Sequence, residues 1–127
     1  MNLVLVGAGG ATGAIARYLA GVGYGRVAGT GQPYFATFGI NVLGGFLMGA
    51  LVAALALKIN EGGERWRLLL GVGVLGGFTT FSSFSLEAVG MIERRAYGVA
   101  AAYVVGSAVL SILALMLGLG LGRRVFA

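Results

Sequence analysis

Residues 76–85 read GGFTTFSSFS, a run of two glycines, three phenylalanines and five hydroxyl-bearing residues. The run lies inside an apolar segment, Leu68–Leu86, that carries no charged side chain. A membrane-spanning helix needs about 20 mainly apolar residues, so this segment is long enough to cross a bilayer. Paired glycines lower helix propensity, and threonine hydroxyls compete for backbone hydrogen bonds. The sequence therefore predicts a transmembrane helix that is broken near residues 76–80.

The rest of the chain has the same apolar character. Of its 127 residues, 58% are hydrophobic and only 10% are charged, which leaves too few charges to cover a soluble domain. Three further apolar segments have the length of membrane spans. We therefore expect an all-α membrane protein that forms a single domain over residues 1–127. The four expected transmembrane helices cover approximately residues 2–22, 34–58, 66–93 and 96–122.

Two chemically versatile residue types are missing from the chain. It contains neither cysteine nor histidine. Disulfides, thiolate chemistry, the commonest general base and the commonest transition-metal ligand are thereby excluded. The spans also contain no pair of carboxylates. We therefore expect that the protein is not an enzyme, and that its surroundings are the lipid bilayer rather than a nucleic acid.

The basic residues are nearly balanced between the two sides of the membrane. An even number of spans puts both termini on one side, together with the connection 58–67. That side carries Lys58, Arg65, Arg67, Arg123 and Arg124, and the other side carries Arg26, Arg94, Arg95 and, if it extends that way, Arg17. Because the Lys/Arg bias of short loops sets orientation, two readings stay open. The chain has one weakly favoured orientation, or it inserts both ways and pairs as an antiparallel, dual-topology homodimer.

Several polar residues fall within the expected spans. Asn41 lies in the middle of the second span, one turn after Thr37, and Tyr103, Ser107 and Ser111 follow one another at four-residue intervals on the fourth. A single serine most simply bonds back to the carbonyl four residues earlier. A stripe of three residues together with a central asparagine favours a polar path through the bundle, lined by uncharged donors that suit an anion.

A break inside the membrane has chemical consequences of its own. It frees backbone carbonyls, which are tolerated only where protein, water or an ion satisfies them, and carbonyls between half-helices can hold Na⁺. Beyond the break, Phe81 and Phe84 are three residues apart and share a helix face. Because the edges of aromatic rings are electropositive, this pair suits a narrow anion path, although simple packing also explains it.

Three stretches of the sequence resemble one known family. GGFTTFSSFSLE (76–87), GAGGATGAIARYLAG (7–21) and TFGINVLGGFLMG (37–49) are similar to the conserved blocks of the CrcB/Fluc family of fluoride ion channels. The resemblance covers the whole chain in length, span order and motif order. It implies a multi-pass channel of the inner cell membrane, built as an antiparallel dual-topology homodimer, that exports fluoride passively and so relieves fluoride toxicity in the cytoplasm.

The resemblance also implies roles for individual residues. The backbone carbonyls of Gly76 and Thr79 would hold a structural Na⁺ at the dimer centre that is not transported, and no organic cofactor is expected. The fluoride pathway would be lined by Phe81, Phe84, Asn41, Ser107 and Ser111, with Tyr103 close by. Four further residues are expected at a vestibule or gate: Arg17, Glu87, Ser83 and Thr37.

Two other functions stay open from the sequence. A small multidrug-type proton-coupled exporter is also a four-helix dual-topology dimer, and Glu87 is the one candidate for its coupling carboxylate. A non-transporting membrane subunit that assembles other proteins would conduct no ions.

Overall fold

The computed structural model describes residues 1–127 except residues 30, 59 and 60. Within the described residues, every regular element is a helix. In chain order these are α1 (Asn2–Ala28), α2 (Tyr34–Leu57), α3 (Gly63–Trp66), the π-helix η1 (Arg67–Leu75), α4 (Gly76–Phe78), α5 (Phe81–Glu93) and α6 (Tyr97–Phe126).

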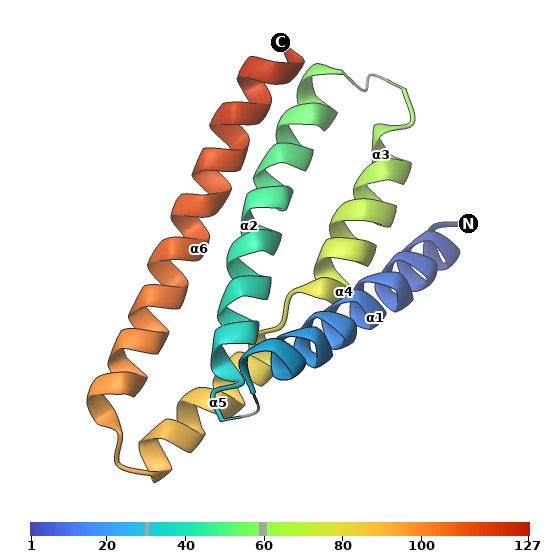
Figure 1. The fold of residues 1–127 in the computed structure, drawn as a ribbon. Coiled ribbons are helices and arrows are strands. Elements are labelled where there is room, and N and C mark those ends of the chain that lie inside the picture. The colour runs from blue at the N-terminus through green and yellow to red at the C-terminus, as the bar shows by residue number, and fades with distance from the viewer. Residues whose placement is uncertain (30, 59–60) are drawn as a thin grey trace.

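Four helical stretches are long and apolar enough to cross a membrane. They are Asn2–Ala28, Tyr34–Leu57, Gly63–Glu93 and Tyr97–Phe126. The prediction of an all-α chain with four spans is therefore confirmed at the level of helix type, length and composition. In Figure 1, α2 and α6 lie side by side, while α1 lies against η1 and α4. Both termini point toward the end of the bundle that carries the α2–α3 connection.

Several helix ends differ from the expected ones. α1 continues to Ala28 instead of ending near residue 22, because the glycines in its second half do not interrupt it, as is common in membrane helices. It ends where Gly29 adopts a positive φ of 83°, a conformation that favours glycine. α6 continues to Phe126, and Arg123 and Arg124 in its last turn complement the negative end of the helix dipole. In the predicted connection 58–67, a helix already begins at Gly63, and residues 59 and 60 lie outside the described residues.

The third helical stretch is irregular along its length. η1 has the wider hydrogen-bonding pattern of a π-helix over residues Arg67–Leu75, and α4 adds three α-helical residues. Thr79 then has a ψ of 158° and Thr80 a φ of −149°, so both residues are extended. α5 begins at Phe81. Pi-helical segments occur frequently at functional sites, and here the segment leads directly to the two extended threonines.

The helices approach one another closely at glycines. A Cβ atom at Gly118 of α6 would collide with the carbonyl oxygen of Phe46 on α2, and one at Gly13 of α1 would collide with that of Val74 on η1. Lipid provides no hydrophobic drive for helix association, so close backbone contact at small residues supplies much of the attraction. These glycines therefore fix the distances between the elements that surround the interruption.

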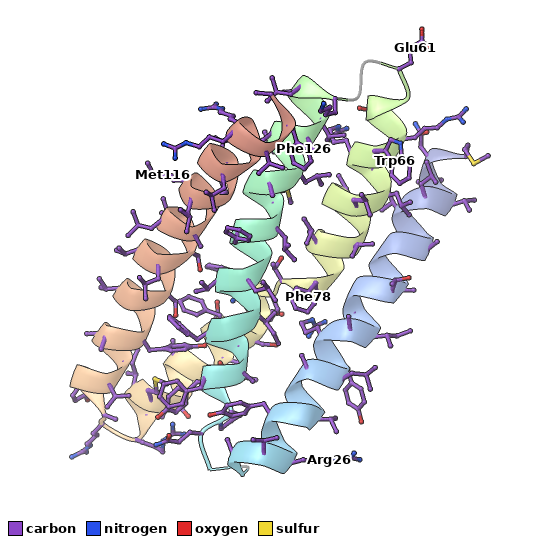
Figure 2. The ribbon with its side chains drawn as sticks, turned by 45° about the horizontal axis from the view of Figure 1, so that its top comes forward. Arg26, Glu61, Trp66, Phe78, Met116 and Phe126 are labelled. Atoms are coloured by element: carbon purple, nitrogen blue, oxygen red, sulfur yellow. The ribbon has the colours of Figure 1, made fainter. Side chains whose placement is uncertain are left out.

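The buried side chains gather where α5 turns into α6. The cluster consists of Ala88, Met91, Ala100 and Tyr103, with Tyr34, Phe38 and Phe84 packed against it. Ile40 and Leu75 are buried elsewhere, but many large apolar side chains point outward, as Met116 does on the outer face of α6, where it is 61% exposed (Figure 2). Exposed apolar surface along all four spans suits a multi-pass membrane protein in contact with lipid.

The close contact of α6 with α2 leads to a first prediction. Gly118→Ala should lower the free energy of unfolding by about 1–3 kcal/mol, the usual cost of overpacking, because the new methyl group meets a backbone oxygen that cannot move aside. Thermal unfolding in detergent, followed by Trp66 fluorescence, measures the change. Gly120→Ala is the matched control, since a Cβ at Gly120 meets no atom within 4 Å. Equal destabilisation by both variants would contradict the prediction.

Candidate functional site

The interruption is held by one side chain from α2. The Asn41 amide donates from Nδ2 to the carbonyl of Thr80 (3.0 Å), and the N–H of Thr80 donates to Asn41 Oδ1 (2.8 Å). The Thr80 hydroxyl accepts the N–H of Ser83 at 3.2 Å and so caps the start of α5. Thr80 is therefore fixed through its N–H, its carbonyl and its hydroxyl.

These contacts redirect the donors that a continuous helix would use. In an α-helix the Thr80 N–H would bond to the carbonyl of Gly76, and the Ser83 N–H to that of Thr79. Here the first donor goes to Asn41 and the second to the Thr80 hydroxyl. The carbonyls of Gly76 and Thr79 have thus lost their helical donors.

The neighbouring carbonyls have acquired new donors. Arg17 Nε donates to the carbonyl of Gly77 at 3.2 Å, and Asn41 Nδ2 donates to the carbonyl of Thr80. Hard cations prefer oxygen ligands, and carbonyls between half-helices can bind Na⁺. The donor set of Gly76 and Thr79 therefore fits the predicted cation. Within the described residues, no group of three or more His, Cys, Asp or Glu residues is placed to hold a metal ion.

Most of the predicted fluoride-path residues line one cavity. Its volume is about 430 Å³, and its walls include Asn41, Phe81, Phe84, Ser107 and Ser111. The Ser107 side chain is 4% exposed, and its hydroxyl has no hydrogen-bond partner among the described residues. By contrast, the hydroxyls of Thr79 and Ser85 bond back to carbonyls four residues earlier. Ser107 thus offers a free donor to a guest in the cavity.

Four aromatic rings form a row that begins at this cavity. Phe81 and Phe84 have ring centroids 5.7 Å apart, Phe84 and Tyr103 5.1 Å, and Tyr103 and Tyr34 5.7 Å. The last pair meets edge to face at 71°. Phe81 is 78% exposed, whereas Phe84 packs against the buried cluster. The row therefore runs from the surface of the chain into its interior.

The four residues expected at a vestibule or gate also come together. Arg17, Thr37, Ser83 and Glu87 line a second cavity of about 730 Å³ between α1, α2 and α5. Within it, the hydroxyl of Thr37 donates to Glu87 Oε1 at 2.8 Å. The hydroxyl of Tyr103 donates to Glu87 Oε2 at 2.5 Å. Tyr103 thus lies outside the 430 Å³ cavity and connects its Phe84 wall to the Glu87 carboxylate.

Sequence reasoning missed two residues of this site. Thr80 lines both cavities and holds the interruption, and its capping pattern, a threonine three residues before Ser83, was the available signal. Tyr34 ends the row of rings, although it lies far from the other three in the sequence. No local pattern identifies Tyr34, because its contact with Tyr103 depends on how α2 meets α6.

The sequence is similar to those of known proteins along most of its length. The family model described as CrcB-like protein, Camphor Resistance (CrcB), matches residues 4–119. A protein of Phenylobacterium zucineum named fluoride-specific ion channel FluC is 63% identical over 125 residues, 98% of each chain. Proteins of the same name from Caulobacter vibrioides and Agrobacterium fabrum are 60% and 50% identical over 126 residues, 99% of this chain and at least 98% of theirs. The chain belongs to the CrcB-like family.

Proposed function

We propose that this protein is a fluoride-selective ion channel that lets fluoride leave the cytoplasm passively, down its electrochemical gradient, and so relieves fluoride toxicity. The observation that carries the proposal is the 430 Å³ cavity, in which the Asn41 amide, the free Ser107 hydroxyl and two phenylalanine rings converge. Full-length relatives that carry the name of a fluoride-specific ion channel support it. The inner cell membrane is the proposed location.

The lining of the cavity suits the chemistry of fluoride. Fluoride is small and strongly hydrated, so a path must replace its water with close donors. Asn41 and Ser107 supply N–H and O–H groups without a fixed positive charge that would trap the ion, and ring edges add a weaker attraction. A narrow passage excludes the larger chloride ion, since pore selectivity depends on diameter and on the lining donors.

We further propose that two antiparallel protomers form the channel and hold one Na⁺ between them. The freed carbonyls of Gly76 and Thr79 support the proposal of a bound Na⁺. One chain would supply these two oxygen ligands, and the second chain would supply further ones. The ring of Phe81 supports the second protomer, since it lines the cavity and yet is 78% exposed in the single chain. The carbonyls of Gly76 and Thr79 would hold this Na⁺, which would supply fixed positive charge at the interruption and would not be transported.

The proton-coupled exporter has less support than the channel. Such an exporter needs a carboxylate that exchanges a proton for its cargo. The Glu87 carboxylate instead accepts hydrogen bonds from the hydroxyls of Thr37 and Tyr103. The named relatives are ion channels, which also argues for transport over catalysis. A non-transporting subunit would not require the hydrogen-bond donors of Asn41 and Ser107 to converge on a cavity.

The central prediction concerns ion flux. Purified protein in liposomes should release fluoride when a fluoride gradient and a K⁺ ionophore are supplied, as an ion-selective electrode measures. Chloride efflux under the same conditions should be at least about 100-fold slower, because a narrow path excludes the larger ion. A ratio of about 100 corresponds to a difference of ~2.7 kcal/mol between the barriers that the two ions must cross. Absence of fluoride efflux would favour the non-transporting subunit, and equal chloride efflux would refute selectivity.

A second prediction concerns Na⁺. Replacing Na⁺ with N-methylglucamine should lower thermal stability in detergent, since saturation at about 100 times Kd stabilises a folded protein by ~2.7 kcal/mol. Thr80→Val should weaken this response, because loss of the hydroxyl lets the Ser83 N–H return to the Thr79 carbonyl. Thr79→Val is the matched control, as its hydroxyl bonds only to Leu75 and its carbonyl remains. A wild-type protein that is indifferent to Na⁺ would refute the site.

A third prediction separates the channel from the exporter. Glu87→Gln should keep fluoride efflux within about tenfold of wild type, because it weakens one hydrogen bond worth ~1.4 kcal/mol without stopping passive flow. Glu93→Gln, which changes an exposed carboxylate at the end of the same helix, should leave efflux unchanged. If Glu87→Gln abolishes efflux, or if wild-type efflux needs a proton gradient, the exporter is the better account.

A further inference from the structure

A third cavity, of about 560 Å³, lies beside α5 and the start of α6. Its walls include Pro33, Tyr34, Glu87, Gly90, Arg94 and Val99. None of the predicted site residues except Glu87 belongs to it. Glu87 also lines the cavity that holds Arg17, so its carboxylate is a wall common to both hollows.

Arg94 is turned back along α5 toward this cavity. Its Nη1 atom lies 3.4 Å from the position that a Cβ atom would take at Gly90, one turn earlier on the helix. The missing side chain at Gly90 therefore leaves space for the guanidinium group. Glu87, Gly90 and Arg94 lie at spacings of three and four residues, so they share one helix face.

The donors of Arg94 are available to a guest. Within the described residues the only ion pair joins Arg67 and Glu64, far from this helix face. The oxygens of Glu87 accept instead from Thr37 and Tyr103. An unpaired guanidinium group at the wall of a cavity attracts small anions and raises their local concentration.

The row of rings joins this cavity to the proposed fluoride path. Phe84 lines the 430 Å³ cavity, Tyr103 stacks beside it and donates to Glu87, and Tyr34 lines the 560 Å³ cavity. Tyr34 and Tyr103 are in edge contact. Rings and hydroxyls therefore continue without interruption from one cavity to the other.

We propose that the 560 Å³ cavity is a second mouth of the anion path, and that Arg94 collects small inorganic anions there before they reach Tyr103. The inference rests on the proposed fluoride channel. Arg94 is the anion-binding residue of the mouth, and Gly90 provides the space in which its guanidinium group lies. Figure 2 shows Arg26 at the end of α1, and Arg26 adds to the basic residues Arg94 and Arg95 of the connection between α5 and α6.

Fluoride efflux from liposomes at subsaturating fluoride tests the proposal. Arg94→Gln should reduce efflux about three- to tenfold at ~0.01 M ionic strength, where electrostatic attraction extends to ~30 Å, and less than about twofold at ~1 M sodium gluconate, where it extends to ~3 Å. Arg94→Lys should restore most of the efflux. The half-saturating fluoride concentration should rise in Arg94→Gln, while the maximal rate stays unchanged.

Arg95→Gln is the matched control. It removes the same charge from the same connection, so it alters the Lys/Arg bias equally, but Arg95 does not line the cavity. Fluoride efflux that is as fast in Arg94→Gln as in the wild-type protein would overturn the proposed mouth and leave the proposed channel intact. An equal loss in Arg95→Gln would assign the effect to net charge and also overturn it. Failure of the wild-type protein to conduct fluoride would instead refute the channel itself.

Discussion

The pair of hydrogen bonds between the Asn41 amide and the backbone of Thr80 is the contact on which the candidate site depends. An interrupted helix exposes N–H and C=O groups that cost several kcal/mol each when they lie unsatisfied in hydrocarbon. A carboxamide can satisfy both groups at once, because it donates and accepts in one plane. A carboxylate can only accept. One side chain on α2 therefore fixes the residue at which α5 begins.

The contacts of Thr80 also leave two backbone carbonyls without their helical donors. By taking the Thr80 N–H, Asn41 removes the helical donor of the Gly76 carbonyl, and the Thr80 hydroxyl does the same to the Thr79 carbonyl. Asn41 thus accounts for one freed carbonyl, and the Thr80 hydroxyl accounts for the other. Because Thr80 also lines both the 430 Å³ and the 730 Å³ cavities, the proposed cation site and these two cavities meet at this threonine.

Much of this arrangement could be predicted from the sequence, and the remainder shows where local patterns stop. Uninterrupted apolar runs predict four helices because the bilayer requires about 20 such residues for each span. The contact of Tyr34 with Tyr103 and the place of Arg94 at the 560 Å³ cavity could not be predicted, since they depend on how α2 and α5 meet the start of α6. The end of α1 was also missed, because glycines that weaken a helix in water are common in membrane helices.

Arg17 illustrates how tertiary contacts alter an argument made from charge alone. From the sequence alone, Arg17 could extend to the membrane surface, where it would nearly balance the number of basic residues on the two sides of the membrane. In the structure its Nε donates to the Gly77 carbonyl, so its head group is held beside the interruption. The remaining loop residues divide as five against three, and a difference of two positive charges is a weak constraint on orientation. Arg17 therefore contributes to the interior of the proposed channel, where its remaining guanidinium donors line the cavity that also holds Glu87. Because Arg17 bonds to the carbonyl of Gly77, next to the freed carbonyl of Gly76, it links the packing of α1 to the geometry of the interruption.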